Sequence, residues 1–493
     1  MGALISIISK DGRNVIPEAI KMLSALKHRG SKAHGISTDR MTNIVKNFDD
    51  FIDLSDDGSS VVMGYNFSQN LPDDAPQPIE GDNFKIVFDG RIFSPHIKVR
   101  EVVDFIKQFS DVKHAIRNLI ERTEGSFSLT ILKDGKLYAG RDPLGAKPLY
   151  FCESKKFYAL ASERKALWLL GIDNKNIKSF PPGNLAEIDC KGIIFQPIKL
   201  LEKPKIKPLP VEKALKELYK LLLNSIRVRT LDLEKVSIAF SGGLDSSVIA
   251  ALIRESGVDA FLVSVGLEGT KDLEQSEKVA NEIGLPLKTK VYTLDDVEKD
   301  LPTVLWLIEE ANALKASICI PEFWAAEISS GIGCQAMFSG QGSDELFGGY
   351  HKYLKEYAKS ADNVEWSLYN DMLMLYESSL EPEEKLCSFQ GLEARFPYVD
   401  FDLVSFALSL PISQKISSVN DPLRKRILRH LAEYIGLPED VYLTPKKAIQ
   451  YSTGVSQALK KIARKNKLKM QEFINRVFQR IEWSNEDSNS VFS

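Results

Sequence analysis

Short apolar runs alternate with turn residues through the first 200 positions of the chain. The clearest runs are residues 3–8, 61–64, 85–88, 126–132 and 156–161. Glycine, aspartate and proline separate them, as in a layered sheet domain. One helical pattern interrupts the runs at residues 16–26. The pattern predicts a strand-rich domain over residues 1–203.

The pattern changes after a stretch rich in lysine and proline at residues 202–210, whose composition suits an extended linker. Beyond it, the apolar spacing predicts helices at 211–229, 246–256 and 273–283, and buried strands at 236–240, 260–265 and 335–338. Strands that alternate with helices indicate a parallel sheet covered on both faces. Helical patterns dominate from residue 353. We therefore predict a second domain over 204–483 and a polar tail over 484–493.

Composition narrows the classes of partner. The chain has 493 residues and a net charge of −3, from 64 basic and 67 acidic side chains. This balance gives no reason to expect a nucleic-acid or membrane partner, and no apolar run reaches the roughly 18 residues of a membrane span. The five cysteines are scattered without a CxxC pair. They indicate reduced thiols and a cytoplasmic location rather than disulfides or a zinc site.

The most informative segment is a buried strand at 236–240 followed by Ser241-Gly-Gly-Leu-Asp-Ser-Ser247 and a helix. Glycines let the backbone approach an anion, and the free N–H groups at a helix N-terminus attract it. The GK[ST] ending of a Walker A loop is absent. The segment predicts a phosphate-binding loop of another type.

This loop resembles the pyrophosphate loop of ATP-pyrophosphatase enzymes, and further motifs narrow the resemblance to the asparagine synthetase family. These motifs are residues 264–273, 315–317, 339–350, 391–400 and 445–446 followed by 452–455. The resemblance implies an α/β domain of the adenine nucleotide α-hydrolase (PP-loop) type with a helical C-terminal part. It also implies a ligase that activates a carboxylate, with aspartate expected, as an acyl-adenylate and releases pyrophosphate.

The resemblance assigns roles to residues of this sequence. ATP and Mg²⁺ are the implied cofactors, with Asp245 and Asp344 as metal ligands because Mg²⁺ prefers carboxylate oxygens. Lys446 matches the lysine that stabilises charge on the reacting phosphate, although Lys447 is adjacent. The implied nucleotide-binding residues are Phe240, Ser241, Gly242, Gly243, Leu244, Asp245, Ser246, Ser247, Val265, Gly266, Ser339 and Gly340.

One position departs from the family pattern. Where the family carries an acid that accepts a proton from the attacking amine, this chain has Gln341. An amide is no general base at neutral pH. Glu345 and Glu393 lie close by in the motifs and are candidates to replace the acid. The predicted catalytic residues are Lys446, Gln341 and Glu345.

The N-terminal half resembles the class II glutamine amidotransferase domain, an Ntn-hydrolase-like αββα sandwich. The strings that carry this resemblance are residues 28–30, 88–90, 124–127, 141–145, 148–150, 161–163 and 181–183. In that family a cysteine follows the initiator methionine and attacks glutamine; Gly2 stands there and has no side chain to attack with.

Other glutamine-handling positions are also altered. The oxyanion-hole asparagine before Gly90 is replaced by Asp89, whose carboxylate would repel a developing oxyanion. The arginine that binds the glutamine carboxylate is missing from residues 63–67, and the acidic pair that receives the glutamine amine is not recognisable near 94–99. We expect a domain that keeps its fold for packing, regulation or oligomerisation and has lost glutaminase activity.

The sequence thus predicts a ligase that uses ammonia directly or from a separate source, with a homodimer left open. A β-lactam-synthetase-like enzyme, which would carry tyrosine at Gln341, and an amidoligase for a different acid are the nearest alternatives. A nucleotide-modifying or tRNA-acting relative lacks support, since the catalytic cysteine pair and a basic surface are missing. A non-catalytic ATP-binding regulator is favoured only by Gln341.

Overall fold

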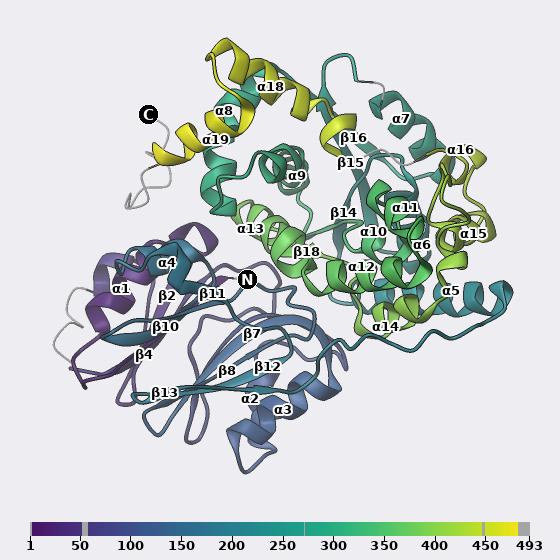
Figure 1. Ribbon diagram of the computed structural model, residues 1–493. Coiled ribbons are helices and arrows are strands. Elements are labelled where there is room, and N and C mark those ends of the chain that lie inside the picture. Colours follow the sequence, from purple (N-terminus) through teal and green to yellow (C-terminus); the bar gives the residue numbers. More distant parts are fainter. Residues whose placement is uncertain (1, 52–57, 271, 446–448, 482–493) are drawn as a thin grey trace. The chain divides into compact units, whose positions relative to one another are not determined.

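The computed structural model describes residues 2–51, 58–270, 272–445 and 449–481, and the chain forms two compact units, 1–200 and 201–480 (Figure 1). The predicted polar tail at 484–493 and Lys446 with its neighbours 447–448 lie outside the described residues. Among the described helices, none combines the length and apolarity needed to cross a membrane.

The N-terminal unit contains two sheets. The first is antiparallel and seven-stranded, in the order β11 (Ile177–Ser179), β9 (Tyr150–Glu153), β10 (Phe157–Ala161), β1 (Gly2–Ser9), β4 (Val61–Phe67), β2 (Ala33–Ser37), β3 (Thr42–Val45). The second is six-stranded, in the order β13 (Gly192–Pro197), β12 (Asn184–Asp189), β8 (Lys136–Arg141), β7 (Glu124–Lys133), β6 (Lys85–Ser94), β5 (Ile79–Glu80).

Alternation along β1 builds two of the layers of this unit. Leu4 and Ile8 pack into a core shared with Val87 and Leu132 of the second sheet. Side chains on the opposite face of β1, such as Ile5, pack against α1 (Ile16–Ser24) and α4 (Arg164–Trp168). Helices α2 (Glu101–Lys107) and α3 (Val112–Arg122) cover the second sheet (Figure 1). The αββα sandwich is confirmed.

Three of these helices were not predicted, since the sequence pattern indicated one helix, which is α1. Helices α2 and α3 are short and rich in valine and isoleucine, residues that also suit strands. Helix α4 has five residues, too few to show a helical period. Single helical turns also occur at Lys27–Arg29 and Asn174–Asn176.

The second unit is built on a five-stranded sheet in which all neighbours are parallel. Its order is β16 (Leu287–Tyr292), β15 (Asp259–Leu267), β14 (Lys235–Ala239), β17 (Ala336–Phe338), β18 (Glu393–Arg395). The chain moves outward from β14 in one direction to β16, then returns to the other side of β14 for β17. Ligands of such sheets bind at the carboxyl ends of the strands where the order reverses, which here lies between β14 and β17.

Helices flank this sheet and make up most of the chain after it, which confirms the α/β fold and its helical C-terminal part. They are α5 (Val211–Val228), α6 (Leu244–Ser256), α7 (Asp272–Ile283), α8 (Leu294–Ile308), α9 (Ala313–Gly331), α10 (Ser343–Phe347), α11 (His351–Tyr357), α12 (Ala361–Leu373), α13 (Glu381–Phe389), α14 (Phe401–Ser409), α15 (Arg426–Tyr434), α16 (Glu439–Tyr442), α17 (Ile449–Ser452), α18 (Val455–Lys465) and α19 (Met470–Gln479). A π-helical turn spans Tyr376–Leu380, and a 3-10 turn spans Ile412–Gln414.

Candidate active site

The first glycine turn joins β14 to α6, as the sequence indicates. Gly242 has a φ of +67°, and a Cβ atom there would come 3.1 Å from the Cα of Ser276. Only glycine meets both conditions without strain. Gly243 caps α6 and its N–H donates to the hydroxyl of Ser241. The turn therefore presents the N-terminus of a 13-residue helix at the carboxyl end of β14, a geometry that favours anions.

The second glycine turn lies beside the first. It joins β17 to α10, and Gly342 has a φ of +89°. A Cβ atom on Gly340 would lie 3.0 Å from the Cβ of Asp245. The hydroxyl of Ser343 donates to Asp245 Oδ1 over 2.8 Å. Two motifs about 100 residues apart in the sequence are thus in direct contact at the switch point of the sheet.

A cavity of about 940 Å³ opens between the two turns. Most of the predicted site residues line it: Phe240, Ser241, Gly242, Gly243, Leu244, Asp245, Ser246, Val265, Ser339, Gly340, Gln341 and Asp344. Ser247 is fully buried behind the turn, and Gly266 lies in β15 outside the lining. Glu345 is also outside the lining, and its carboxylate accepts a hydrogen bond from the Tyr350 hydroxyl over 2.7 Å.

A lysine that the sequence patterns did not single out lies between the two aspartates. The ammonium of Lys425 is 2.6 Å from Asp245 Oδ1 and 2.7 Å from Asp344 Oδ1. The Lys425 side chain is buried, and this burial lowers its pKa, although the Asp245 carboxylate opposes the shift. Gly349 packs against the group, since a Cβ atom there would overlap Asp344 Oδ1 and Lys425 Cε. The only sequence signal was the run of basic residues at 424–429.

The pair of aspartates fits a magnesium ion. Both carboxylates converge on one cationic atom, the nitrogen of Lys425. Mg²⁺ is commonly held by one or two carboxylates, with water and substrate phosphates completing its shell. Within the described part of the chain there is no group of three or more histidine, cysteine, aspartate or glutamate side chains placed to bind a metal. Two carboxylates therefore suit an ion that arrives with phosphate.

The cavity is also lined by two buried acids, Glu322 on α9 and Glu383 on α13. The amide of Gln341 donates to Glu322 Oε1 over 3.0 Å. Burial raises the pKa of both carboxyls, that of Glu383 to about 7. Glu393, by contrast, is paired with Arg395. The sequence motifs gave no signal for Glu322 or Glu383, because neither stands in a string that carried the family resemblance.

In the N-terminal unit, the position of the family's nucleophile is closely packed. The backbone N–H of Gly2 donates to Asp89 Oδ1 over 3.2 Å. A Cβ atom at Gly2 would overlap the carbonyl oxygen of Asn66 and lie 2.5 Å from Cζ of Tyr65. The Asp89 side chain is fully buried, 3.7 Å from the guanidinium of Arg29. Strand β1 therefore has no room at residue 2 for a side chain.

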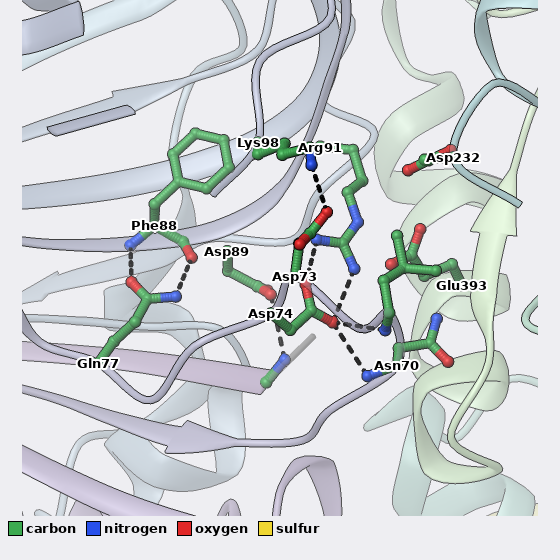
Figure 2. A network of polar contacts seen from close by, with 12 residues as sticks. Asn70, Asp73, Asp74, Gln77, Phe88, Asp89, Arg91, Lys98, Asp232 and Glu393 are labelled. Carbon is green, nitrogen blue, oxygen red and sulfur yellow. Dashed lines mark hydrogen bonds and ion pairs between the residues drawn. The ribbon is translucent and has the colours of Figure 1, made fainter. Parts of the chain in front are cut away.

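Polar side chains of the same unit pair with one another (Figure 2). Arg91 and Asp74 form a buried ion pair, and the amide of Gln77 bonds both the N–H and the carbonyl of Phe88. Asp74, Gln77 and Phe88 also line a small cavity, together with Tyr65 and Gly90, that measures about 10 Å³. That is about the space of one water molecule, and a glutamine side chain does not fit.

Each of the two units matches a known protein family. Residues 217–363 and 357–488 match the asparagine synthase family, and residues 66–168 match the glutamine amidotransferase domain. A Methanocaldococcus jannaschii protein assigned as a glutamine-hydrolyzing asparagine synthetase is 30% identical over 98% of this chain and 99% of its own length. This chain belongs to the asparagine synthetase family. Family membership makes it an ATP-dependent amide ligase by general reaction class.

Two further matches of this asparagine synthetase family member have lower sequence identity. The glutamine-hydrolyzing asparagine synthetase of Rattus norvegicus is 27% identical over 70% of this chain and 66% of its own length. Among solved structures, a glutamine phosphoribosylpyrophosphate amidotransferase from B. subtilis is 14% identical, covering 58% of this chain and 65% of its own, with a TM-score of 0.35. That TM-score is too low to support a further conclusion.

Proposed function

We propose that this chain activates aspartate with ATP, forms an aspartyl-adenylate with release of pyrophosphate, and joins ammonia to it to give an amide and AMP. The observation that carries the proposal is the contact between the two glycine turns at Asp245, Gly340 and Ser343. It supports a triphosphate held between the N-terminus of α6 and the second turn.

The polar groups beside the turns suit the charge that develops when pyrophosphate leaves. The ammonium of Lys425, held by Asp245 and Asp344, is a fixed positive charge at the edge of the cavity. Preformed charges of this kind stabilise a transition state because they need no reorganisation during reaction. Mg²⁺ held by the two aspartates would neutralise further charge on the phosphates. Lys446 remains the predicted partner of the α-phosphate.

The adenylation half of the proposal is tested by acid-dependent exchange of labelled pyrophosphate into ATP. Exchange that requires aspartate and Mg²⁺ supports the proposal. Exchange with another acid of a carboxylate panel, and not with aspartate, would support adenylation but show that the substrate is a different acid. That result would favour an amidoligase for another acid or a β-lactam-synthetase-like enzyme. ATP binding without exchange for any acid would favour a non-catalytic regulator.

We further propose that the nitrogen comes from ammonia and that the N-terminal unit hydrolyses no glutamine. Three features support this: Gly2 has no side chain and no room for one, the carboxylate of Asp89 stands where a donor is needed, and the adjacent cavity holds about 10 Å³. Glutamate production from glutamine in the presence of ATP and aspartate would contradict the proposal. The scattered cysteines of this chain also support the proposal that the enzyme is cytoplasmic.

A further inference from the structure

The two buried acids on the cavity wall occupy an unusual environment. Glu322 is 6% exposed and Glu383 is 1% exposed, and both line the cavity next to Gln341. Among the described residues, neither carboxylate oxygen of Glu383 has a partner at hydrogen-bond geometry, although the Ser339 hydroxyl and the Gln341 amide lie near enough to lower its pKa against the effect of burial. A buried, unpaired carboxylate is costly. Its persistence at a cavity wall indicates that a ligand with hydrogen-bond donors completes the site.

The ligand suited to this wall is a cation. Glu322 and Glu383 interact strongly enough that the charge of Glu383 further raises the pKa of Glu322. Two carboxylates in one low-dielectric site cannot both be ionised unless a positive charge lies between them. Within the described part of the chain, no lysine, arginine or histidine forms an ion pair with either acid. An ammonium ion supplies both the charge and the N–H donors.

The charged groups on the surrounding elements are already paired. Lys315, on the same helix as Glu322, binds Glu310. Lys385, on the same helix as Glu383, binds Glu309 at the end of α8. Arg395 of β18 binds Glu393 and Asp232. The nearby thiol of Cys319 is buried and its pKa is raised, so it is neutral.

These pairings also separate the two acids from the other candidates for a base. Glu345 accepts a hydrogen bond from Tyr350, and Glu393 is held by Arg395, as described above. Neither lines the cavity. Glu322 and Glu383 do, and Gln341 contacts Glu322 directly. Residue 341 lacks a carboxylate, but Glu322, which it contacts, and Glu383 supply carboxylates to the same cavity.

We propose that Glu322 and Glu383 form the site that binds the incoming ammonium ion and removes its proton. This inference rests on the proposed amide-forming reaction. One carboxylate oxygen accepts a proton from NH₄⁺, and the freed lone pair of NH₃ attacks the carbonyl carbon of the acyl-adenylate. The C–O bond to AMP then breaks and its electron pair leaves with AMP, while the phosphate of AMP accepts the second proton lost by the nitrogen.

The test measures adenylation and amide formation separately, in the chain with both units. Glu383→Gln and Glu322→Gln keep the side-chain shape but remove the basic oxygen. We expect pyrophosphate exchange within about twofold of wild type, whereas amide formation from ammonium falls about 100-fold, the scale of one general base. Hydroxylamine is largely uncharged at neutral pH and needs no prior deprotonation, so hydroxamate formation stays within a fewfold of wild type. Glu327→Gln, on α9 and outside the cavity lining, is the matched control.

A carboxylate returned to the family's position provides a second test. In the Glu383→Gln background, Gln341→Glu restores ammonium-dependent amide formation if the missing function is proton removal. Normal use of ammonium by both single variants would overturn the inference. So would a rise in the KM for aspartate in the exchange reaction, because the pair would then bind the substrate's own amino group. Absence of exchange in the wild-type chain would instead refute the proposed function itself.

Discussion

Replacing Gly2 with cysteine tests whether the N-terminal unit has lost more than its nucleophile. The new Cβ would overlap the carbonyl oxygen of Asn66 and lie 2.5 Å from the Tyr65 ring. Because a backbone atom in a paired strand cannot move aside easily, we expect a cost near the upper end for overpacking, about 3 kcal/mol. For a unit of about 200 residues this corresponds to a fall in melting temperature of roughly 6–12 °C.

The assay compares thermal unfolding and glutamate production in two single variants. Gly192→Cys is the matched control, because nothing lies within 4 Å of a Cβ atom there and its φ is not positive. We expect Gly192→Cys to melt like wild type, and neither variant to release glutamate. A Gly2→Cys chain that melts like wild type and hydrolyses glutamine would refute the packing argument.

Three further predictions concern the synthetase unit. Lys425→Met leaves two partly buried aspartates without their cation, so we expect a loss of about 3 kcal/mol, the lower end of the range for breaking a fully buried pair, with Mg²⁺ raising the melting temperature more than in wild type; an equal rise in both would contradict the predicted metal site. Gly349→Ala should abolish pyrophosphate exchange by displacing Asp344 and Lys425, whereas Gly331→Ala, which meets nothing within 4 Å, should not. Because the raised pKa of Glu383, about 7, favours its neutral form in the fold, its contribution to stability is present below its ordinary value of 4.5 and is lost as pH rises through about 7. Glu383→Gln should therefore melt above wild type at about pH 8 and like it at about pH 5, and a gap that does not change with pH would contradict the shift.

Features set by local chemistry could be predicted from the sequence. The glycine turns after β14 and β17 were predictable because a positive φ and a close backbone approach leave few alternatives to glycine. Eight strands were predictable because their apolar runs are bounded by turn residues, namely β1, β4, β6, β7, β10, β14, β15 and β17. The other described strands, such as β16 and β18, were not predicted. The parallel sheet and most of the residues that line the cavity could be predicted from these two signals.

Features set by distant contacts could not be predicted. Lys425 stands 180 positions after Asp245, and in the sequence only the basic residues around it distinguish it from a surface lysine. Glu322 lies in a helix that is otherwise mostly apolar, and Glu383 lies in an acidic run that reads as a solvated helix start. Burial is the main cause of the raised pKa of both carboxyls, and burial depends on which helices pack together.

The bridge from Lys425 to Asp245 also bears on how the chain acquires its site during synthesis. The loop after β14 and the turn after β17 leave the ribosome well before residue 425, so a nascent chain that ends before it lacks the ammonium that bridges Asp245 and Asp344. Closing a loop of that length costs entropy that only the finished unit repays. Nucleotide retention by ribosome-bound chains of increasing length would consequently report the completion of the whole synthetase unit rather than of its central sheet.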